Sequence, residues 1–327
     1  MDRKRSVSTL GSWAVLFFAV SIALSAGVLA ASYPAQTITL IVPYVPGGVT
    51  DLGARAFADA LQRELKQTVV VVNKAGGGTT IGGNAVATAK PDGYTLGFLP
   101  TSASIPEVFT YFNEAPYTSK DLRPVARVLG PVLAVTVRAD SPYNSLKDLV
   151  EAGKKARNIK MATHGKSTLG YLVLRTVGKA EKVNFIDVPF AGDSQIVPAI
   201  LGGHVPVGTP AYPAIKSLID AKQLKVLALC LEKRAYFAPN VPTVAELGYK
   251  LAFVSYLGVF APRGTPDDVV KKLDGAARKI TQEADFRAKL NNMGTQVTYE
   301  ETATFQKSIA SYKENLAAFF KEEGMVK

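Results

Sequence analysis

The sequence has very few of the cysteine and histidine residues on which metal sites and disulfide frameworks depend. Among 327 residues there is one cysteine, Cys230, and there are two histidines, His164 and His204. A single cysteine excludes a disulfide framework and a cysteine-based zinc site. Two histidines leave little for histidine-based metal or acid–base chemistry. We therefore expect no metal site and no cofactor.

Nucleotide and hydrolase motifs are also missing. Gly165-Lys166-Ser167 ends like a phosphate-binding loop, but the first glycine of that motif would fall at position 160, where lysine stands. The glycine turn that starts at Gly76 has Ile81 where a dinucleotide-binding turn has its third glycine. No G-x-S-x-G elbow occurs, and the sequence identifies no acid that would orient His164. We therefore expect that the protein is not an enzyme.

The composition describes a globular chain with a surplus of positive charge. Hydrophobic residues make up 47% of the sequence, which excludes a disordered chain, and the length gives room for about two domains. Lys and Arg number 38 against 27 Asp and Glu, so the formal net charge is +11. Such a surplus suits nucleic acid, a membrane surface or small anions. Because the basic residues are dispersed and no nucleic-acid motif occurs, nucleic acid is not an expected partner.

The first 31 residues have the pattern of an export signal. Three basic residues at 3–5 precede an apolar segment, Trp13 to Leu24, and small residues follow up to Ala30 and Ala31. This order predicts a signal peptide cleaved near Ala30 or Ala31. A membrane anchor is the alternative, but the apolar segment is shorter than the roughly 20 residues of a spanning helix. Without residues 1–31 the net charge is +9.

Runs of apolar and β-branched residues predict buried strands that alternate with helices. The predicted strands are 37–44, 68–73, 94–99, 133–137, 159–163, 184–189, 205–208, 225–230 and 253–260. This order indicates an α/β fold with parallel pairing and right-handed crossovers. Thr50 is expected to cap a helix whose apolar face carries Phe57 and Leu61. Residues 266–323 are expected to be mostly helical.

The predicted elements form two α/β units, of which the first ends near residue 135. The helical C-terminal part needs a sheet to cover, and the strands at 133–137 and 253–260 could each cross between the units. We therefore expect one lobe from residues 32–135 plus 253–327 and a second lobe from residues 136–252. Two lobes joined by two crossing strands form a hinged cleft, which suits a small ligand.

Four loops at strand ends are rich in glycine, serine and threonine. They are Pro46–Asp51, Gly76–Thr80, Thr101–Ser102 and Thr163–Thr168. In a parallel sheet these loops lie at the carboxyl edge, where open α/β folds bind ligands, and helix N-termini there attract anions. Glycine permits close backbone approach, and hydroxyl groups add hydrogen-bond donors. For any single loop a plain connecting turn explains the composition equally well, but four such loops favour binding of a carboxylate-type anion without chemistry.

Short sequence blocks follow one another in a recognisable order. They include Pro46-Gly47-Gly48-x-Thr50-Asp51, Val70-Val71-Val72-Asn73, Pro91-Asp92-Gly93-Tyr94, Val188-Pro189-Phe190-x-Gly192 and Leu201-Gly202-Gly203-His204. In this order they resemble the Bug/TctC-type periplasmic solute-binding proteins of tripartite tricarboxylate transporters, over essentially all of the chain after the export signal. The resemblance implies a two-lobed Venus-flytrap fold with parallel-rich sheets and two crossing strands. It also implies a monomer that binds carboxylated molecules through backbone amides and waters.

The resemblance further implies a ligand site built from both lobes. The expected first-lobe contacts are Tyr44, Gly47, Gly48, Thr50, Asp51, Gly76, Gly77, Gly78, Thr79, Thr80, Thr101 and Ser102. The expected second-lobe contacts are Thr163, His164, Ser167, Thr168, Phe190, Ala191, Gly192 and Thr209.

The chain departs from the family pattern at positions that bear on specificity. A frequent aspartate is replaced around Thr209-Pro210, a family histidine by Tyr171 and a frequent tryptophan by Tyr256, while His164 and Lys166 stand at positions that are commonly small or neutral. The loss of an acid and the gain of Lys166 lead to the hypothesis that the site favours an anionic ligand and disfavours an amino group.

These observations predict a periplasmic receptor that captures a small anionic carboxylate and delivers it to the membrane subunits of a tripartite tricarboxylate-type transporter. A ligand-binding accessory to a sensor kinase is an alternative that the sequence does not separate from the first. An exported enzyme on the same architecture is less favoured, because the sequence lacks an acid–base set.

Overall fold

The computed structural model describes residues 33–109, 114–231, 233–235, 237–249, 255–293, 295–322 and 324. The fold described below is that of the compact unit Gln36–Lys327. The predicted export signal, 1–31, lies outside the described residues. In the part of the chain that the structure describes, no helix combines the length and the apolar character needed to cross a membrane.

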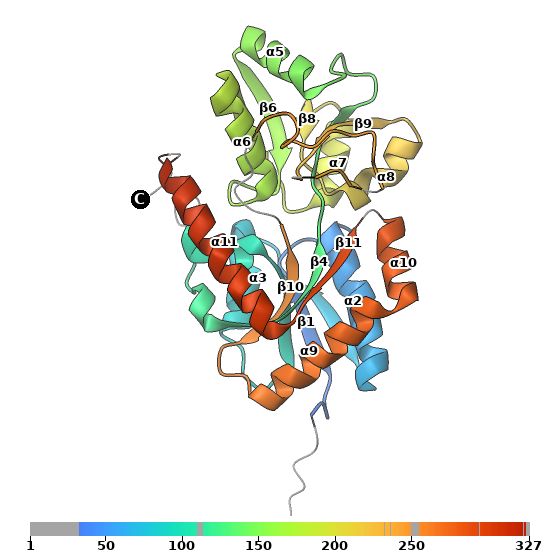
Figure 1. The fold of residues 1–327 in the computed structure, drawn as a ribbon, viewed down its shortest axis with the longest axis vertical. Helices are drawn as coiled ribbons and strands as arrows, with labels where there is room; N and C mark the ends of the chain where they lie inside the picture. Colours follow the sequence, from blue (N-terminus) through green and yellow to red (C-terminus); the bar gives the residue numbers. More distant parts are fainter. Residues whose placement is uncertain are drawn as a thin grey trace, which may run out of the picture. The chain divides into compact units, whose positions relative to one another are not determined.

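The first of two sheets collects strands from both ends of the chain (Figure 1). Its order is β11-β4-β10-β3-β1-β2, with the bounds β1 (Ile38–Val42), β2 (Val69–Asn73), β3 (Thr95–Pro100), β4 (Leu122–Gly130), β10 (Leu257–Pro262) and β11 (Gln296–Glu300). β1 runs parallel to β2 and β3, which confirms the predicted parallel pairing there. β10 is antiparallel to both of its neighbours, and β11 is antiparallel to β4.

The helices around this sheet also come from both ends of the chain. They are α2 (Val49–Leu65), η1 (Gly77–Thr79), α3 (Thr80–Ala87), α4 (Thr101–Ser104), η2 (Pro106–Phe109), η3 (Ser119–Asp121), α9 (Asp267–Gln282), α10 (Ala284–Asn292) and α11 (Thr302–Glu322). α2 lies beside α9 and α10, whereas α11 runs along β4 (Figure 1). The C-terminal part of the chain therefore completes the first sheet rather than forming a unit of its own.

The second sheet is continuous in sequence. Its order is β7-β6-β8-β5-β9, with the bounds β5 (Ala134–Arg138), β6 (Asn158–Thr163), β7 (Asn184–Pro189), β8 (Val207–Gly208) and β9 (Leu224–Leu229). β6 is parallel to β7 and β8, and β5 is antiparallel to β8 and β9. Its helices are α5 (Leu146–Ala156), α6 (Leu169–Glu181), α7 (Asp193–Leu201) and α8 (Tyr212–Asp220). Ser145 caps α5 by accepting a hydrogen bond from the Asp148 N–H.

The chain passes between the two sheets twice. It leaves the first sheet after β4 and enters the second at β5, and it returns after β9 to β10. β5 and β10 each belong to one sheet, so the crossings lie in the connecting segments beside these strands. Of the second predicted crossing strand, residues 253 and 254 lie outside the described part.

The sequence analysis did not predict two strands of the first sheet, β4 and β11. β4 contains Pro124 and two arginines, which weaken the apolar pattern, and β11 lies in a region that was expected to be mostly helical. Arg127 of β4 is nevertheless buried, because its guanidinium contacts the Glu300 carboxylate of β11 at 2.7 Å. The two strands that were not predicted are thus joined by a salt bridge, with Arg127 on β4 and Glu300 on β11.

The start of α2 differs in one detail from the prediction. The N-cap residue is Gly48, with extended backbone and no side-chain cap, and Thr50 lies in the first turn instead. The predicted apolar face of this helix is confirmed, because Phe57 and Leu61 are buried. Because no cap side chain occupies it, the N-terminus of α2 is open to groups from elsewhere in the fold.

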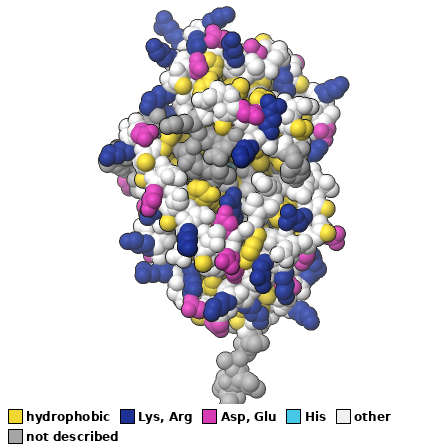
Figure 2. Space-filling model, viewed as in Figure 1, with side chains coloured by type: hydrophobic (Ala, Val, Ile, Leu, Met, Phe, Trp, Pro, Cys, Tyr) yellow, Lys and Arg dark blue, Asp and Glu magenta, His cyan; other side chains and the backbone are white. Residues whose placement is uncertain are grey.

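The positive charge is spread over the surface. On the face drawn in Figure 2, Lys and Arg side chains are interspersed with Asp and Glu, without a continuous basic stripe. Several of the basic residues have an acidic partner, as in the exposed pairs Arg63–Glu283 and Lys216–Asp220. Such exposed pairs each contribute about 0–1 kcal/mol to stability.

Candidate functional site

Two adjoining pockets lie between the two sheets. The inner pocket has a volume of about 50 Å³, and the outer pocket has about 440 Å³. Tyr44, which follows β1, and His164, which follows β6, line both pockets, and their rings meet edge to face at 5.6 Å. One water needs roughly 10–15 Å³, so the inner pocket has room for a group of a few atoms, such as a carboxylate.

The loop before α2 is held in place by Asp51. Its carboxylate accepts hydrogen bonds from the Gly47 N–H at 2.9 Å and from the Asn73 side chain at 2.9 Å, and it pairs with Arg55. Burial would raise the pKa of Asp51, but the hydrogen bonds from Arg55, Gly47 and Asn73 outweigh it and hold this pKa below its usual range. Asp51 does not line either pocket. Its contacts fix the turn at Gly47, where φ is +92°.

The glycine-rich loop after β2 forms part of the outer pocket. Gly76 and Gly78 adopt positive φ angles, which glycine adopts without strain, and both line this pocket together with Thr79. The Thr79 hydroxyl lies 3.1 Å from the Ser102 hydroxyl. Thr80 turns away and donates to the Gly77 carbonyl at 2.8 Å. The loop therefore presents backbone and one hydroxyl to the pocket.

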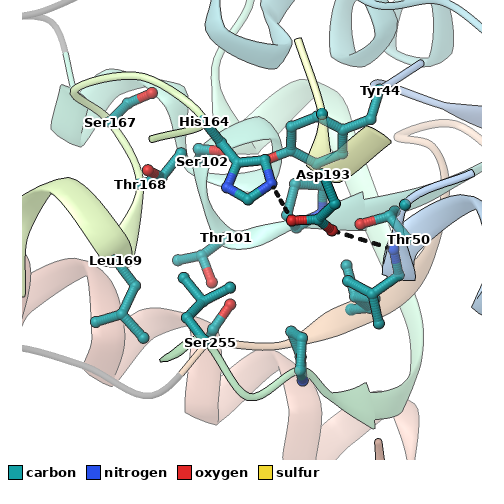
Figure 3. A pocket seen from close by; sticks show the side chains of 17 residues that line it. Tyr44, Thr50, Thr101, Ser102, His164, Ser167, Thr168, Leu169, Asp193 and Ser255 are labelled. Carbon is teal, nitrogen blue, oxygen red and sulfur yellow. Dashed lines mark hydrogen bonds and ion pairs between the residues drawn. The ribbon is translucent and has the colours of Figure 1, made fainter. Parts of the chain in front are cut away.

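Hydroxyl groups from both sheets converge on the inner pocket (Figure 3). Thr101 and Ser102 begin α4, and Ser167 and Thr168 precede α6. The Thr168 hydroxyl donates to the Gly165 carbonyl at 2.7 Å. The Thr101 hydroxyl is different, because it is buried and has no hydrogen-bond partner among the described residues. A buried hydroxyl without a partner costs about 1–3 kcal/mol, so the Thr101 hydroxyl is a hydrogen-bond donor that is still available at the inner pocket.

Asp193, the first residue of α7, links the two sheets across the inner pocket. One carboxylate oxygen lies 2.9 Å from His164 Nε2 and accepts from the Ala211 N–H at 3.0 Å. The other accepts from the Val49 N–H, at the open N-terminus of α2, at 3.3 Å (Figure 3). Burial would raise the pKa of Asp193, but His164 and the two backbone N–H groups hold it below its usual range. Asp193 is thus a buried, ionised carboxylate.

A second acid lies at the outer pocket. Asp187 on β7 accepts a hydrogen bond from the Thr163 hydroxyl at 2.6 Å. Burial raises the pKa of Asp187, and this effect exceeds the opposing effects of Thr163 and of the Lys166 charge. Lys166 lines the same pocket and is exposed. The basic residue that the sequence analysis singled out therefore faces the mouth of the site rather than its interior.

Most of the residues expected from the sequence come together at these pockets. Those that line one or both are Tyr44, Gly48, Thr50, Gly76, Gly78, Thr79, Thr101, Ser102, His164, Ser167, Thr168, Phe190, Ala191 and Gly192. Those that line neither are Gly47, Asp51, Gly77, Thr80, Thr163 and Thr209. Thr163 and Asp51 instead hold neighbouring groups through hydrogen bonds, and Thr209 is fully buried.

The sequence analysis missed the acid of the inner pocket. It counted an aspartate as lost near Thr209, whereas Asp193 provides a carboxylate from the start of α7. The available signal was an acidic residue directly after Gly192, since acidic side chains favour the first turn of a helix. The missed apolar lining residues include Leu133, Leu169 and Leu257. Among the described residues, no group of three or more potential metal ligands is placed to hold an ion.

The comparison with known families agrees with this geometry. Residues 53–325 match the family described as "Tripartite tricarboxylate transporter family receptor", TctC. The chain belongs to this family. The resemblance drawn from the ordered sequence blocks is therefore confirmed. TctC proteins form a family of solute-binding receptors associated with transporters, not a family of enzymes.

Individual relatives cover most of this TctC receptor. The protein BugT of Bordetella pertussis is 33% identical over 278 residues, which are 84% of this chain and 83% of BugT. The solved structure of the periplasmic binding protein BugD is 30% identical and superposes with a TM-score of 0.82 over 90% of this chain and 99% of BugD. The expected two-lobed periplasmic-binding-protein fold is thereby confirmed.

Two solved relatives contain carboxylate ligands. MatC of Rhodopseudomonas palustris, solved with bound malate, is 26% identical, with a TM-score of 0.78 over 87% of this chain and 100% of MatC. A second R. palustris protein, solved with adipate, is 25% identical, with a TM-score of 0.81 over 89% of this chain and 98% of that protein. The expected function class, a solute-binding receptor, is confirmed for this chain by its family.

Proposed function

We propose that this TctC receptor captures a small carboxylate-bearing compound in the two pockets between its sheets and hands it to the membrane subunits of a tripartite tricarboxylate-type transporter, without chemistry. The observation that carries the proposal is at Thr101, which lines the inner pocket and whose buried hydroxyl has no partner among the described residues. A carboxylate oxygen is an acceptor for such a donor. The malate and adipate of the two relatives support the same ligand class.

The place of action and the boundaries of the chain's parts belong to the same proposal. We propose that residues 1–31 direct export to the periplasm and are removed near Ala30 or Ala31. Residues 32–135 plus 253–327 would then act as one lobe and residues 136–252 as the other, in a monomer. The periplasmic relative BugD supports the location.

The first experiment is a thermal-shift screen of purified protein against di- and tricarboxylates, monocarboxylates and amino acids. A ligand at 100 times its Kd stabilises the folded state by about 2.7 kcal/mol, which such a screen detects. We expect carboxylates, with malate and adipate as the first probes, to raise the unfolding temperature. If only compounds without a carboxylate stabilise the protein, the proposed ligand class is wrong.

Thr101→Val separates binding from stability. Valine keeps the shape of threonine and removes the hydroxyl, so we expect the free energy of unfolding to stay equal or to rise by about 1 kcal/mol. Carboxylate affinity, measured by calorimetry, should fall about tenfold, because a hydrogen bond to a charged group is lost. Thr295→Val is the matched control, since its hydroxyl is also buried and unpartnered but lies outside both pockets. Unchanged affinity in Thr101→Val would remove Thr101 from the site.

Closure of the two lobes onto the ligand is testable at Gly192. A Cβ atom there would lie 2.8 Å from Cγ2 of Val45, which follows β1 of the first sheet, while the backbone of Gly192 is extended and accepts any residue. Gly192→Ala should therefore hold the lobes apart and weaken ligand binding about tenfold. The pair Gly192→Ala with Val45→Ala removes the clash and should restore most of the affinity. Equal weakening in both variants would show that closure at this contact is not required.

A further inference from the structure

The outer pocket has room for most of a ligand but few polar side chains to orient it. Its volume is about 440 Å³, against about 50 Å³ for the inner pocket, and Tyr44 and His164 line both. A ligand whose carboxylate occupies the inner pocket therefore continues past these two rings into the outer pocket. Much of the outer lining is apolar and includes Pro43, Pro189 and Phe190. The few polar groups of this lining thus decide which groups the outer part of the ligand carries.

One carboxylate of the outer pocket is only half satisfied. The Oδ1 atom of Asp187 accepts a hydrogen bond from the Thr163 hydroxyl at 2.6 Å. The Oδ2 atom is buried and has no hydrogen-bond partner among the described residues. By contrast, the carboxylate of Asp193 at the inner pocket has partners on both of its oxygens. Asp187 therefore brings an unused acceptor to the outer pocket.

This unused acceptor is unfavourable as long as it lacks a donor. A buried carboxylate oxygen without a hydrogen bond has lost its hydration and gained nothing in return. The same burial raises the pKa of Asp187, against the opposing effects of the Thr163 hydroxyl and the Lys166 charge. An ionised carboxylate only accepts hydrogen bonds, so the missing partner is a donor. A donor group on the ligand would supply it.

The neighbouring side chains leave this place to a ligand. The Thr163 hydroxyl has one proton, which it donates to Oδ1 of Asp187, and it accepts from the Gly165 N–H at 2.9 Å. Lys166 lines the same pocket but is exposed, and it acts on Asp187 through its charge. The outer pocket therefore offers an acceptor at Asp187 and a positive charge at Lys166. These two groups suit a hydroxyl and a second carboxylate, respectively.

We propose that Asp187 accepts a hydrogen bond from a hydroxyl group of the ligand, so that the receptor selects hydroxy-dicarboxylates over dicarboxylates without a hydroxyl. One carboxylate of the ligand lies in the inner pocket, and the second lies near Lys166. An ammonium group is also a donor, but the Lys166 charge that acts on Asp187 disfavours a second cation there. This inference rests on the proposed function and deepens it, because it names the class of carboxylate that the site selects.

Pairs of ligands that differ in one hydroxyl test this selection directly. The pairs are malate with succinate, 2-hydroxyglutarate with glutarate and 2-hydroxyadipate with adipate, each titrated into the intact protein by calorimetry at neutral pH. The distance between the hydroxyl and the far carboxylate grows along this series. We expect the hydroxy member to bind about tenfold more tightly or better in the pair whose length fits, because a hydrogen bond to a charged group is gained. One enantiomer of that hydroxy acid should account for the preference.

Three variants assign the preference to Asp187. Asp187→Ala removes the acceptor and should bring the ratio of the two affinities in the fitting pair to about 1. Asp187→Asn keeps an acceptor oxygen and should retain part of the preference. Lys166→Gln is the matched control from the same pocket, and it should weaken both members of the pair alike and leave their ratio unchanged. Because each ratio is measured within one variant, a change in overall stability does not imitate the expected result.

The outcomes separate this inference from the proposed function. If no carboxylate binds, the proposed function fails and this inference falls with it. If the members of all three pairs bind equally, or if Asp187→Ala keeps the wild-type preference, the inference alone is overturned. Tighter binding of the matching amino acids, which are aspartate, glutamate and 2-aminoadipate, would show that the donor is an ammonium group and would overturn the hydroxyl assignment. The wild-type series decides the question even if a variant does not fold.

Discussion

Glu300→Leu is expected to lower the free energy of unfolding by about 3 kcal/mol. Arg127 and Glu300 join β4 to β11, with 10% and 20% of their side chains exposed and 2.7 Å between Nη1 and Oε1. Without the carboxylate, the Arg127 guanidinium stays buried with the Tyr312 hydroxyl, 3.5 Å away, as a weak partner. An uncompensated buried charge is costly because neither water nor a counter-charge stabilises it. Chemical denaturation with urea at neutral pH measures the loss.

The matched controls show whether burial is the cause. Arg127→Met combined with Glu300→Leu replaces both charges by apolar side chains, and we expect it to recover stability to within about 1 kcal/mol of the wild type. Lys216→Met breaks the exposed pair with Asp220 and should cost less than about 1 kcal/mol. A loss in Glu300→Leu no greater than that in Lys216→Met would show that the Arg127–Glu300 pair does not hold β11 on the sheet.

The second large effect is expected at Tyr256. This side chain is fully buried directly before β10, and its ring packs against Phe305 at 5.1 Å and Tyr312 at 5.7 Å. Tyr256→Ala should lower the free energy of unfolding by about 3–5 kcal/mol, because it removes a large side chain and leaves a cavity. Denaturation with guanidinium chloride measures this loss, and calorimetry with a carboxylate measures its effect on the site.

The hydroxyl of Tyr256 connects this core to the site. It lies 2.5 Å from the Ser104 hydroxyl, and Ser104 also donates to the carbonyl of Thr101. Tyr256→Phe keeps the ring and removes this link, so we expect a loss of only about 1 kcal/mol. Carboxylate affinity should fall in Tyr256→Ala, because α4 loses its support. Equal stability losses in the two variants would mean that the hydroxyl, and not the ring, accounts for the role of Tyr256.

Much of the fold could be predicted from local sequence patterns. The β-branched runs at 38–42 and 69–73 mark strands, and the spacing of Phe57 and Leu61 marks the buried face of α2. These signals are local, because the buried face of a strand or helix is determined by the spacing of apolar residues within a short segment. β4 and β11 are different, because burial of Arg127 depends on Glu300, which lies 173 residues further along the chain. No local pattern contains that information.

The candidate site divides in the same way. The loops at strand ends were visible because glycine and hydroxyl residues cluster there, and topology alone brings such loops to one edge of a sheet. The contact of Asp193 with the Val49 N–H was not visible, because the two residues are 144 positions apart. The N-cap residue of α2, Gly48, also has no side chain that would have indicated a partner. The unpartnered state of the Thr101 hydroxyl is likewise a property of its surroundings, not of the residue.

The position of β10 has a consequence for how the chain matures. β10 lies between β3 and β4, so the first sheet is interrupted at that place until residues 257–262 have been synthesised. The second sheet uses only residues 134–229 and can close earlier, because its contacts span shorter stretches of chain. The inner pocket takes one wall from each sheet and includes Leu257 itself. A growing chain therefore has no finished binding site until Leu257, about four fifths of the way along its 327 residues, has been synthesised.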